Sequence, residues 1–273
     1  MNPPIPVIVC GALGRMGRRV LEAVLSNDRL KLVGAVERPD CPDLDRDLGP
    51  LIGRPELGAK LADSLAKAAS LANPRARLYI DFTTPEAVMD NLAQAQNDNL
   101  AAVIGTTGLD QAQKKTLGQA AEKIPVVWSP NMSLGVNLMF KVAQFMAKAL
   151  GPDFDIEIVE THHRLKKDAP SGTALKLHEV VAQARSLDPA ASMVTGRKGL
   201  VGARTDGEIG VLAVRAGDVV GDHTVLFAGA GERLELTHRA HSRDTFAAGA
   251  IRAALWLDGQ KPGLYSLSDV LGL

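Results

Sequence analysis

The sequence predicts an α/β fold, in which a Rossmann-like, doubly wound parallel sheet is joined to a second, α+β domain with an open mixed sheet. Three observations predict it. Strand and helix patterns alternate up to about residue 130, and the first strand pattern runs directly into a glycine-rich turn. Beyond about residue 150, strand patterns follow one another with one helix pattern among them, as in a mixed sheet.

The glycine-rich turn follows the strand pattern of residues 7–10 and precedes a helical pattern. In a dinucleotide-binding turn, Gly11 would allow the tight bend, Gly14 the close approach of a pyrophosphate, and Gly17 the packing of helix on strand. Leu13 replaces one glycine of the commoner G-x-G-x-x-G pattern. The motif alone therefore also fits a flexible turn between strand and helix.

The second strand pattern, residues 31–36, ends at Glu37, twenty residues after Gly17. An acid at this distance can accept a hydrogen bond from the ribose 2′-hydroxyl of NADH. Arg38 follows at once, and a guanidinium there can pair with the 2′-phosphate of NADPH. The pair predicts that both cofactors are used, and a solvated, charged strand end is the alternative.

Three further strand patterns occupy residues 78–82, 101–104 and 126–128, and Thr84 and Asp110 are the predicted N-caps of the helices between them. Ligands of doubly wound sheets bind beyond the carboxyl ends of the strands. The loops at these ends also fit ordinary turns. As ligand loops they predict further cofactor contacts at Gly105, Thr106, Thr107, Ser129, Pro130, Asn131 and Met132.

The second half predicts a different organisation. An amphipathic helix pattern covers residues 135–150, and the strand patterns that follow are residues 156–160, 209–214, 224–227 and 234–237. A last helix pattern, 244–257, is expected to return to the first domain. The predicted dinucleotide-binding domain therefore comprises residues 1–131 and 242–273, and the second domain comprises residues 132–241. The Gly- and Pro-rich stretch 40–55 predicts a mobile loop.

Composition excludes several classes of protein. The chain has 273 residues, 46% of them hydrophobic, which is enough for about two domains with sizeable cores. Its 31 basic and 31 acidic residues cancel, which argues against a nucleic-acid or membrane-surface partner. Cys10 and Cys41 lack disulfide or metal-ligand spacing, so we expect reduced thiols and a cytoplasmic location. Neither a signal-peptide pattern nor an apolar run of about 18 residues is present.

The segment 162–173 concentrates groups that can transfer protons or hold positive charge. Two histidines and two lysines precede a Pro-Ser-Gly-Thr turn, which opens an apolar-periodic helix pattern. Free backbone N–H groups at a helix start attract carboxylate or phosphate, so the segment predicts an anion-binding reaction site. A solvated basic loop before a capped helix is the alternative. His162 and His163 are adjacent and would point in opposite directions on a strand, so no catalytic metal is predicted.

Several motifs follow one another along nearly the whole chain. They are Gly11–Gly17, Asp81–Thr83, Gly105–Gly108, Ser129–Asn131, Glu160–Arg164 with Lys166, Asp168–Ala174, Arg215–Gly217 and Gly221–Thr224. In this combination the sequence resembles the 4-hydroxy-tetrahydrodipicolinate reductase family, also called dihydrodipicolinate reductases. The resemblance implies that NADPH or NADH reduces a small cyclic, unsaturated dicarboxylate on the route to diaminopimelate and lysine.

The resemblance also implies roles for individual residues. Residues 132–241 would bind the substrate and form a homotetramer. His162 and Lys166 would be the catalytic pair, since hydride addition leaves electron density that a general acid must protonate. Predicted substrate contacts are His163, Lys166, Ser171, Gly172 and Thr173. Predicted cofactor contacts are Gly11, Ala12, Gly14, Arg15, Met16, Gly17, Glu37 and Arg38, together with the seven loop residues named above.

The remaining basic residues have plainer interpretations. Lys167 is expected to be solvated, and the surface or packing histidines are expected to be His178, His238 and His241. The sequence assigns no chemistry to His223. Two other functions remain open: a different Rossmann-type oxidoreductase of aspartate-family metabolism, and a non-catalytic dinucleotide sensor. The identity of the substrate would distinguish the first of these from the reductase family named above, and measured turnover would distinguish the second.

Overall fold

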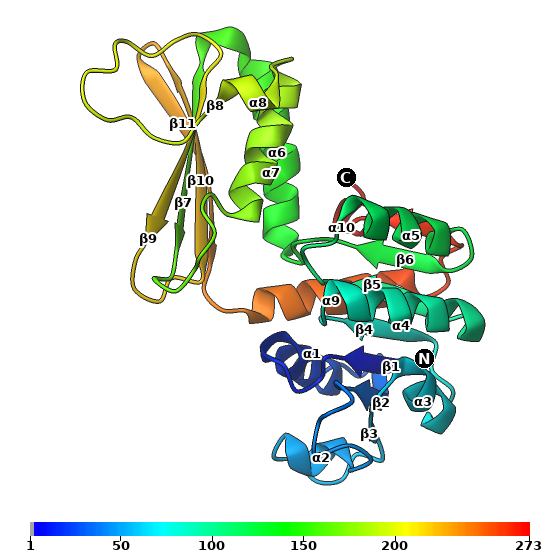
Figure 1. Cartoon of the computed structure of the whole chain (residues 1–273). Helices are drawn as coiled ribbons and strands as arrows, with labels where there is room; N and C mark the ends of the chain where they lie inside the picture. Colours follow the sequence, from blue (N-terminus) through cyan, green and yellow to red (C-terminus); the bar gives the residue numbers. More distant parts are fainter. Residues whose placement is uncertain (1–2) are drawn as a thin grey trace. The chain divides into compact units, whose positions relative to one another are not determined.

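A computed structural model describes residues 3–273, so residues 1 and 2 of the predicted first domain lie outside the described part (Figure 1). The chain divides into two compact units. The first unit contains the chain up to Leu134 and then Arg243–Leu273, and the second unit is Gly135–Ser242. None of the helices in the described residues is both long enough and apolar enough to cross a membrane.

The first unit is built on a parallel sheet. Within the described residues it has seven strands in the order β12-β6-β5-β4-β1-β2-β3. The strands are β1 Ile5–Cys10, β2 Leu30–Val36, β3 Leu61–Ala62, β4 Leu78–Asp81, β5 Ala101–Ile104, β6 Pro125–Trp128 and β12 Gly263–Tyr265. The chain runs outward from β1 in one direction to β2 and in the other to β4, so the strand order reverses beside β1. Such a switch point is where doubly wound sheets bind their ligands.

The helices of the first unit are α1 Arg15–Leu25, α2 Leu48–Leu51, α3 Leu65–Leu71, α4 Pro85–Asp98, α5 Gln111–Ala121, α9 Asp244–Leu257 and α10 Leu267–Leu271. The two predicted N-caps are present. The Thr84 hydroxyl accepts a hydrogen bond from the Ala87 amide, and Asp110 forms a capping box with Gln113. These local signals explain why α4 and α5 begin where the sequence predicts.

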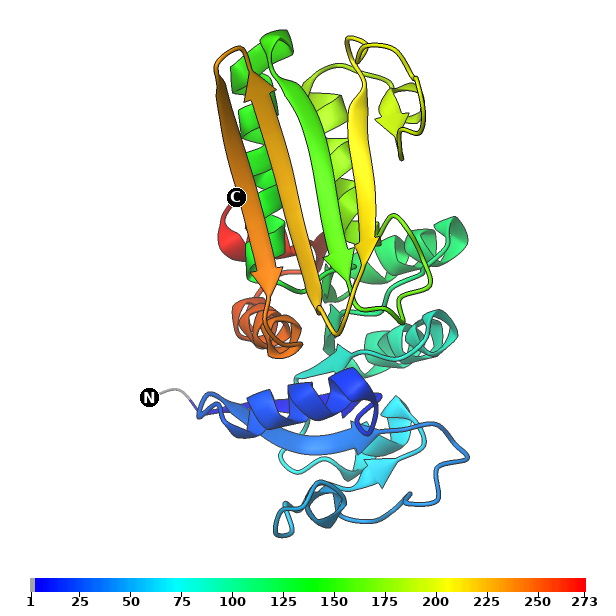
Figure 2. The same cartoon turned by 90° about the vertical axis from the view of Figure 1, so that its left-hand side faces the viewer.

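The second unit contains a mixed sheet in the order β11-β10-β7-β9-β8, counted over the described residues (Figure 2). Its strands are β7 Asp155–His162, β8 Met193–Val194, β9 Ile209–Arg215, β10 Gly221–Gly229 and β11 Glu232–Ala240. Strands β7, β8 and β9 are parallel, whereas β10 is antiparallel to both β7 and β11. The predicted fold class, a parallel sheet followed by an open mixed one, is therefore confirmed.

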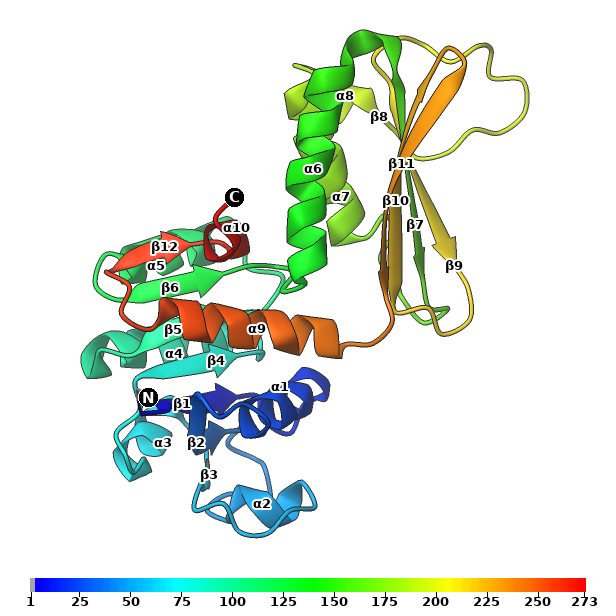
Figure 3. The ribbon, with the colours of Figure 1, turned by 180° about the vertical axis from the view of Figure 1, so that it is seen from behind.

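Helices cover one face of this mixed sheet. The helices of the second half are α6 Leu134–Leu150, α7 Gly172–Ala184 and α8 Pro189–Ser192, with a short 3-10 turn at Gly151–Asp153. In Figure 3, α6 and α7 lie against the same face, where Met139 and Leu177 join a cluster with Ile158 and Val225 of the sheet. Within the second unit, none of the helices covers the opposite face (Figures 1 and 3).

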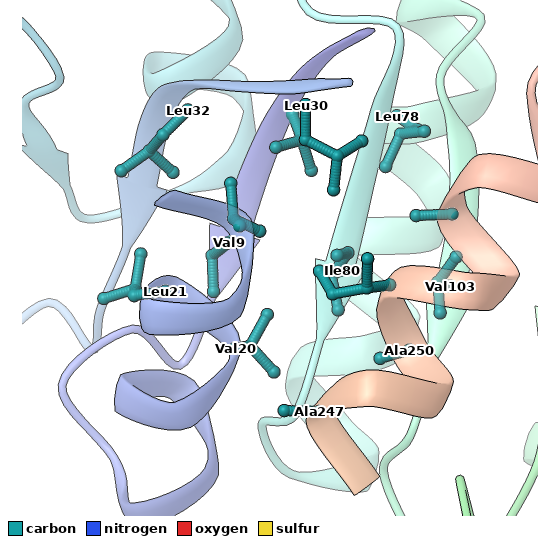
Figure 4. Packing of buried hydrophobic residues seen from close by; sticks show 14 of the residues in the cluster. Val9, Val20, Leu21, Leu30, Leu32, Leu78, Ile80, Val103, Ala247 and Ala250 are labelled. Atoms are coloured by element: carbon teal, nitrogen blue, oxygen red, sulfur yellow. The ribbon is translucent and has the colours of Figure 1, made fainter. Parts of the chain in front are cut away.

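The first unit's sheet is buried on both faces, as parallel sheets usually are. Val7 and Val9 of β1 face a cluster that includes Val20 of α1 and Ala250 of α9 (Figure 4). Ile8 faces a second cluster, which α3, α4 and α5 complete. Alternate residues of one strand thus contribute to both cores. The last long helix occupies the predicted residues and packs in the first unit.

The stretch 40–55 differs from the expected loop, because part of it forms α2. Asp47 caps this helix, and its carboxylate accepts hydrogen bonds from the amides of Gly49 and Leu57 at 2.8 and 2.9 Å. A Cβ on Gly49 would lie 1.9 Å from the carbonyl oxygen of Pro55, so the chain folds back tightly on itself. Local capping therefore adds a short helical turn to a segment whose composition predicts only turns.

Candidate active site

The glycine-rich turn joins β1 to α1 in a bend that has no room for a Cβ atom at Gly11 or Gly17. Gly11 has φ +73°, and a Cβ there would lie 2.8 Å from the carbonyl oxygen of Phe82. A Cβ on Gly17 would lie 1.9 Å from the carbonyl oxygen of Gly11, so α1 rests directly on the turn. Gly14 is the N-cap, and without a side chain it leaves the first N–H groups of α1 uncovered. Such a helix start binds phosphate.

The other predicted residues of this turn differ in exposure. The Ala12 side chain is buried in the core, whereas Met16 is half-buried and Arg15 is exposed. Gly11 and Ala12 both donate their amides to the carbonyl oxygen of Val36 at 2.9 and 3.1 Å. These two bonds fix the turn to the end of β2, where the predicted ribose-binding acid follows.

Glu37 contacts the turn directly. One carboxylate oxygen accepts the Leu13 amide at 3.0 Å, and the other accepts the Arg38 amide at 3.1 Å. The Arg38 guanidinium pairs with Asp40 at 3.1 Å, and both side chains are more than two-thirds exposed. Such exposed pairs contribute little free energy, so Asp40 is a weak competitor for a phosphate at Arg38.

Asp81 connects the ends of β4 and β5 from a fully buried position. Its carboxylate accepts hydrogen bonds from the amide and hydroxyl of Thr83, the Asn91 amide group and the Thr106 hydroxyl. Burial raises the pKa of Asp81, and these hydrogen bonds oppose that rise. Thr106 also accepts the Trp128 indole N–H at its carbonyl oxygen. The hydroxyl and the carbonyl oxygen of Thr106 are therefore both engaged within the protein.

The other loop residues predicted to contact the cofactor lie at the carboxyl ends of β5 and β6. A Cβ on Gly105 would lie 2.3 Å from the Phe82 ring, so a larger residue there would have to displace that ring. The exposed side chains are those of Thr107 and Pro130, with Asn131 half-exposed. Ser129 and Met132 are buried, and the Ser129 hydroxyl donates to the Asn131 carbonyl oxygen at 2.7 Å.

In the second unit, the helix-covered face of the sheet changes from apolar to polar toward the carboxyl end of β7. Ile156 and Ile158 belong to the core, and alternation along the strand brings Glu160 and then His162 onto the same face. His223 of β10 lies opposite Glu160, and Arg215 of β9 lies beside His162. Four separate backbone positions thus place their polar side chains together.

Glu160 is the centre of this group. It is fully buried, and Arg215 donates to it bidentately, with both nitrogens at 2.9 Å. Its carboxylate also contacts the Nδ1 atom of His162 at 2.5 Å and accepts the Ser171 amide at 3.0 Å. Burial alone would raise the pKa of Glu160, but the Arg215 and His162 hydrogen bonds outweigh it, and the pKa is lowered. The carboxylate is therefore ionised at neutral pH.

His162 is held between opposing influences. Burial lowers its pKa, Glu160 raises it, and the charges of Lys166 and Arg215 lower it further, with a lowered pKa as the result. Its ring stands edge-on to that of His223, with centroids 5.2 Å apart. The imidazole is therefore a group that can gain and lose a proton, with a pKa below its ordinary value.

Lys166 lies in the loop after β7 and is about one-fifth exposed. Its ammonium group pairs with Asp168 at 2.9 Å, and Arg215 donates to the Asp168 carbonyl oxygen at 2.6 Å. The hydrogen bond from Lys166 lowers the pKa of Asp168. The Lys166 amide donates to the carbonyl oxygen of His163 at 3.1 Å. Among the described residues, the buried Nδ1 atom of His163 has no hydrogen-bond partner.

The start of α7 lies beside this group. Ser171 is the N-cap, and its hydroxyl accepts the Ala174 amide at 3.3 Å and contacts the Nε2 atom of His223 at 3.2 Å. Gly172 is exposed with open space around its Cβ position, and Thr173 is half-exposed. The Ser171 side chain is thus occupied within the protein, whereas the helix start at Gly172 is open to an anion.

Sequence reasoning did not assign site roles to Glu160, Arg215 and His223. Glu160 lies two residues before His162 on the same strand. Because alternate residues of a strand share a face, this spacing could have predicted that the two side chains lie together. Arg215 and His223 are 53 and 61 residues beyond His162, so only strand pairing brings them near. His178 is a packing histidine as predicted, since it is buried and its Nε2 atom contacts the Ser192 hydroxyl at 3.2 Å.

Together, a dinucleotide-type glycine turn and a buried acid with a histidine and a lysine near it define a class of protein, the nicotinamide-dependent oxidoreductases with two domains. The model of the dihydrodipicolinate reductase N-terminus matches residues 5–132, and that of the C-terminus matches residues 135–271. The chain belongs to the dihydrodipicolinate reductase family, and the resemblance seen in its motifs is confirmed.

Individual relatives agree with this family. The 4-hydroxy-tetrahydrodipicolinate reductase of Thiobacillus denitrificans is 49% identical, over 98% of this chain and 99% of its own length. That of Alkalilimnicola ehrlichii is 50% identical over 98% of each chain. A solved dihydrodipicolinate reductase with bound dipicolinate, from Paenisporosarcina sp. TG-14, has a TM-score of 0.78 at 29% identity and covers 97% of this chain and 99% of its own.

Proposed function

We propose that the chain reduces 4-hydroxy-tetrahydrodipicolinate, via dihydrodipicolinate, to tetrahydrodipicolinate with NADPH or NADH, as a step of diaminopimelate and lysine biosynthesis. Family membership across both halves of the chain carries the proposal. The name that the relatives share gives the substrate. The dipicolinate bound to the Paenisporosarcina protein is a dicarboxylate, which supports a dicarboxylate as the ligand of the basic segment.

The first unit would hold the cofactor. When bound, the reduced nicotinamide supplies the hydride. The turn whose Cβ positions are filled by backbone atoms fits a pyrophosphate at the start of α1. Glu37 would accept from a ribose hydroxyl, and Arg38 would pair with a 2′-phosphate. The loops 105–107 and 129–132 would complete the site, chiefly through their exposed members Thr107 and Pro130.

The second unit would bind and protonate the substrate. The Lys166 ammonium group and His163 would pair with carboxylates, and the N–H groups of Gly172 and Thr173 would donate to them. His162 would hold the proton that the reduced substrate requires, with Lys166 as its partner in proton transfer. Charge-assisted contacts of this kind favour a dianion over a neutral ring.

Assembly and location follow the family expectation. We expect a homotetramer, and the uncovered face of the mixed sheet is a surface that a second copy would bury. The two cysteines are unpaired, as a reducing cytoplasm would leave them.

A coupled assay tests the function. Purified protein given the condensation product of pyruvate and aspartate semialdehyde should consume NADPH and NADH, measured as loss of nicotinamide absorbance. Lys166→Ala and His162→Gln should each lower turnover by about 100-fold while cofactor affinity stays near the wild-type value. Lys167→Ala is the matched control, because this neighbouring lysine is exposed, and it should turn over normally.

Three outcomes would count against the proposal. Turnover of a different aspartate-family substrate alone would identify another oxidoreductase. Cofactor binding without turnover of any such substrate would favour a dinucleotide sensor. A large loss of NADH binding in Lys166→Ala would show that this lysine belongs to the cofactor site.

A further inference from the structure

Glu160 does more than pair with Arg215, because it also has hydrogen-bond contacts with His162 and with the Ser171 amide. In the described residues, its donors come from three segments: His162 of β7, Arg215 at the end of β9, and the amide of Ser171 before α7. A buried carboxylate is costly unless its acceptor sites are filled. Here both oxygens are filled, and one of the donors is the ring proposed to transfer the proton.

The contact with His162 determines which ring nitrogen carries the hydrogen. An ionised carboxylate only accepts hydrogen bonds, so the Nδ1 atom of His162 must be the donor. That leaves Nε2 as the atom that gains and loses the proton. A Cβ on Gly221 would lie 3.0 Å from this Nε2 atom, so glycine at that position keeps the space beside it open.

We propose that Glu160 is a positioning residue of the proposed reduction, which holds His162 with Nδ1 protonated and Nε2 free to exchange a proton, and at the same time ties this ring to the start of α7. The proposal rests on the proposed function for the role of His162. It requires no contact between Glu160 and the substrate, because the carboxylate is fully buried and all its bonds are internal.

The charges that face His162 make the proposal testable by pH. One acidic group, Glu160, lies beside His162. Three basic groups also lie near this ring: Lys166 of the loop, Arg215 of β9 and His223 of β10. Glu160 raises the pKa of His162, whereas burial, Lys166 and Arg215 lower it. Loss of the Glu160 charge must therefore lower the pKa of His162. As the pH rises, His162 then loses its proton earlier, so a step that needs protonated His162 slows at a lower pH than in the wild type.

Glu160→Gln keeps the shape and removes the charge. We expect kcat at neutral pH to fall about 100-fold while KM and the Kd of NADH change little, since a lost orientation of the acid affects the chemical step. We also expect the alkaline limb of the kcat profile to move to lower pH. Glu157→Gln is the matched control: Glu157 lies on the same strand and pairs with Arg197 and Arg204, away from His162. It should keep the wild-type profile.

Nitrogen NMR of His162 provides a readout that does not depend on turnover. In the wild-type protein the neutral ring should carry its hydrogen on Nδ1, and in Glu160→Gln this preference should be lost. A wild-type ring protonated on Nε2 would overturn the proposal, and so would a Glu160→Gln variant with an unmoved pH limb. The wild-type spectrum decides the matter even if Glu160→Gln fails to fold, and Glu160→Asp, which keeps the charge, should recover part of kcat.

The two levels of proposal fail in different ways. Absence of turnover in the wild-type protein refutes the proposed function, and a fully active His162→Gln refutes the role of His162 in proton transfer. The positioning role alone is refuted if turnover depends on His162 but the Glu160→Gln substitution changes neither the alkaline limb of the kcat profile nor the tautomer of His162.

Discussion

Replacement of Gly17 by alanine tests whether α1 rests on the glycine turn as closely as the structure shows. The added Cβ would lie 1.9 Å from the carbonyl oxygen of Gly11 and 2.7 Å from that of Ala12. Cβ atoms in proteins essentially never approach other heavy atoms closer than 3.0 Å. Both obstacles are backbone atoms, so no side-chain rotation relieves the contact. The first turn of α1 must therefore move by at least about 1 Å.

The expected cost is that of overpacking. Extra methyl groups in well-packed sites cost about 1–3 kcal/mol, and a backbone obstacle places this substitution near the upper value. A loss of about 3 kcal/mol lowers the melting temperature of a unit of this size by roughly 6–12 °C. The N–H groups that would hold the pyrophosphate move with the helix, so the Kd of NADH should rise about tenfold, which corresponds to 1.4 kcal/mol.

The assay compares thermal melting and NADH titration of Gly17→Ala with those of Gly118→Ala. Gly118 lies inside α5, and a Cβ there meets no atom within 4 Å. Alanine is the better helix former, so Gly118→Ala should stabilise the protein by about 0.5–1 kcal/mol and leave the Kd of NADH unchanged. If Gly17→Ala melted and bound NADH like the wild type, the close packing of α1 on the turn would be refuted.

Two further predictions concern charge. Arg38→Ala should raise the Kd of NADPH about tenfold more than that of NADH, because it removes the partner of the 2′-phosphate; equal effects on both cofactors would discard that role. Burial lowers the pKa of His223 to about 4, so the folded protein resists a proton that the unfolded chain accepts below its ordinary value of 6.5. Stability is therefore full above about pH 6.5 and falls toward pH 4, by up to about 3 kcal/mol, and His223→Gln should show a smaller fall in denaturant unfolding.

The parts of the fold that the sequence predicts well carry their own local signals. The capping box of Asp110 starts α5, and the run from Val7 into Gly11 marks β1 and its turn. The elements that sequence reasoning missed are short. β3 has two residues and β12 has three, too few for a period of two to be recognised, and only pairing with β2 and β6 makes them strands.

The candidate site divides in the same way. His162 and Lys166 could be predicted because they lie in one contiguous basic segment before a helix start. Arg215 could not be given a role, because its position depends on the parallel register in which it pairs with His162. A register between strands that are 46 residues apart in sequence is decided by packing, which no local pattern reports.

The register of β10 shows how the core of the second unit determines its chemistry. Val225 and Phe227 are buried opposite Ile158 and Ile156, and continuation of this alternation brings His223 opposite Glu160 and Gly221 beside His162. A slip of one residue would turn every side chain of the strand to the other face. Asp222 would then enter the group, and a second carboxylate beside Glu160 would raise the pKa of both acids. The apolar residues that exclude such a slip therefore maintain the ionised Glu160, although none of them belongs to the site.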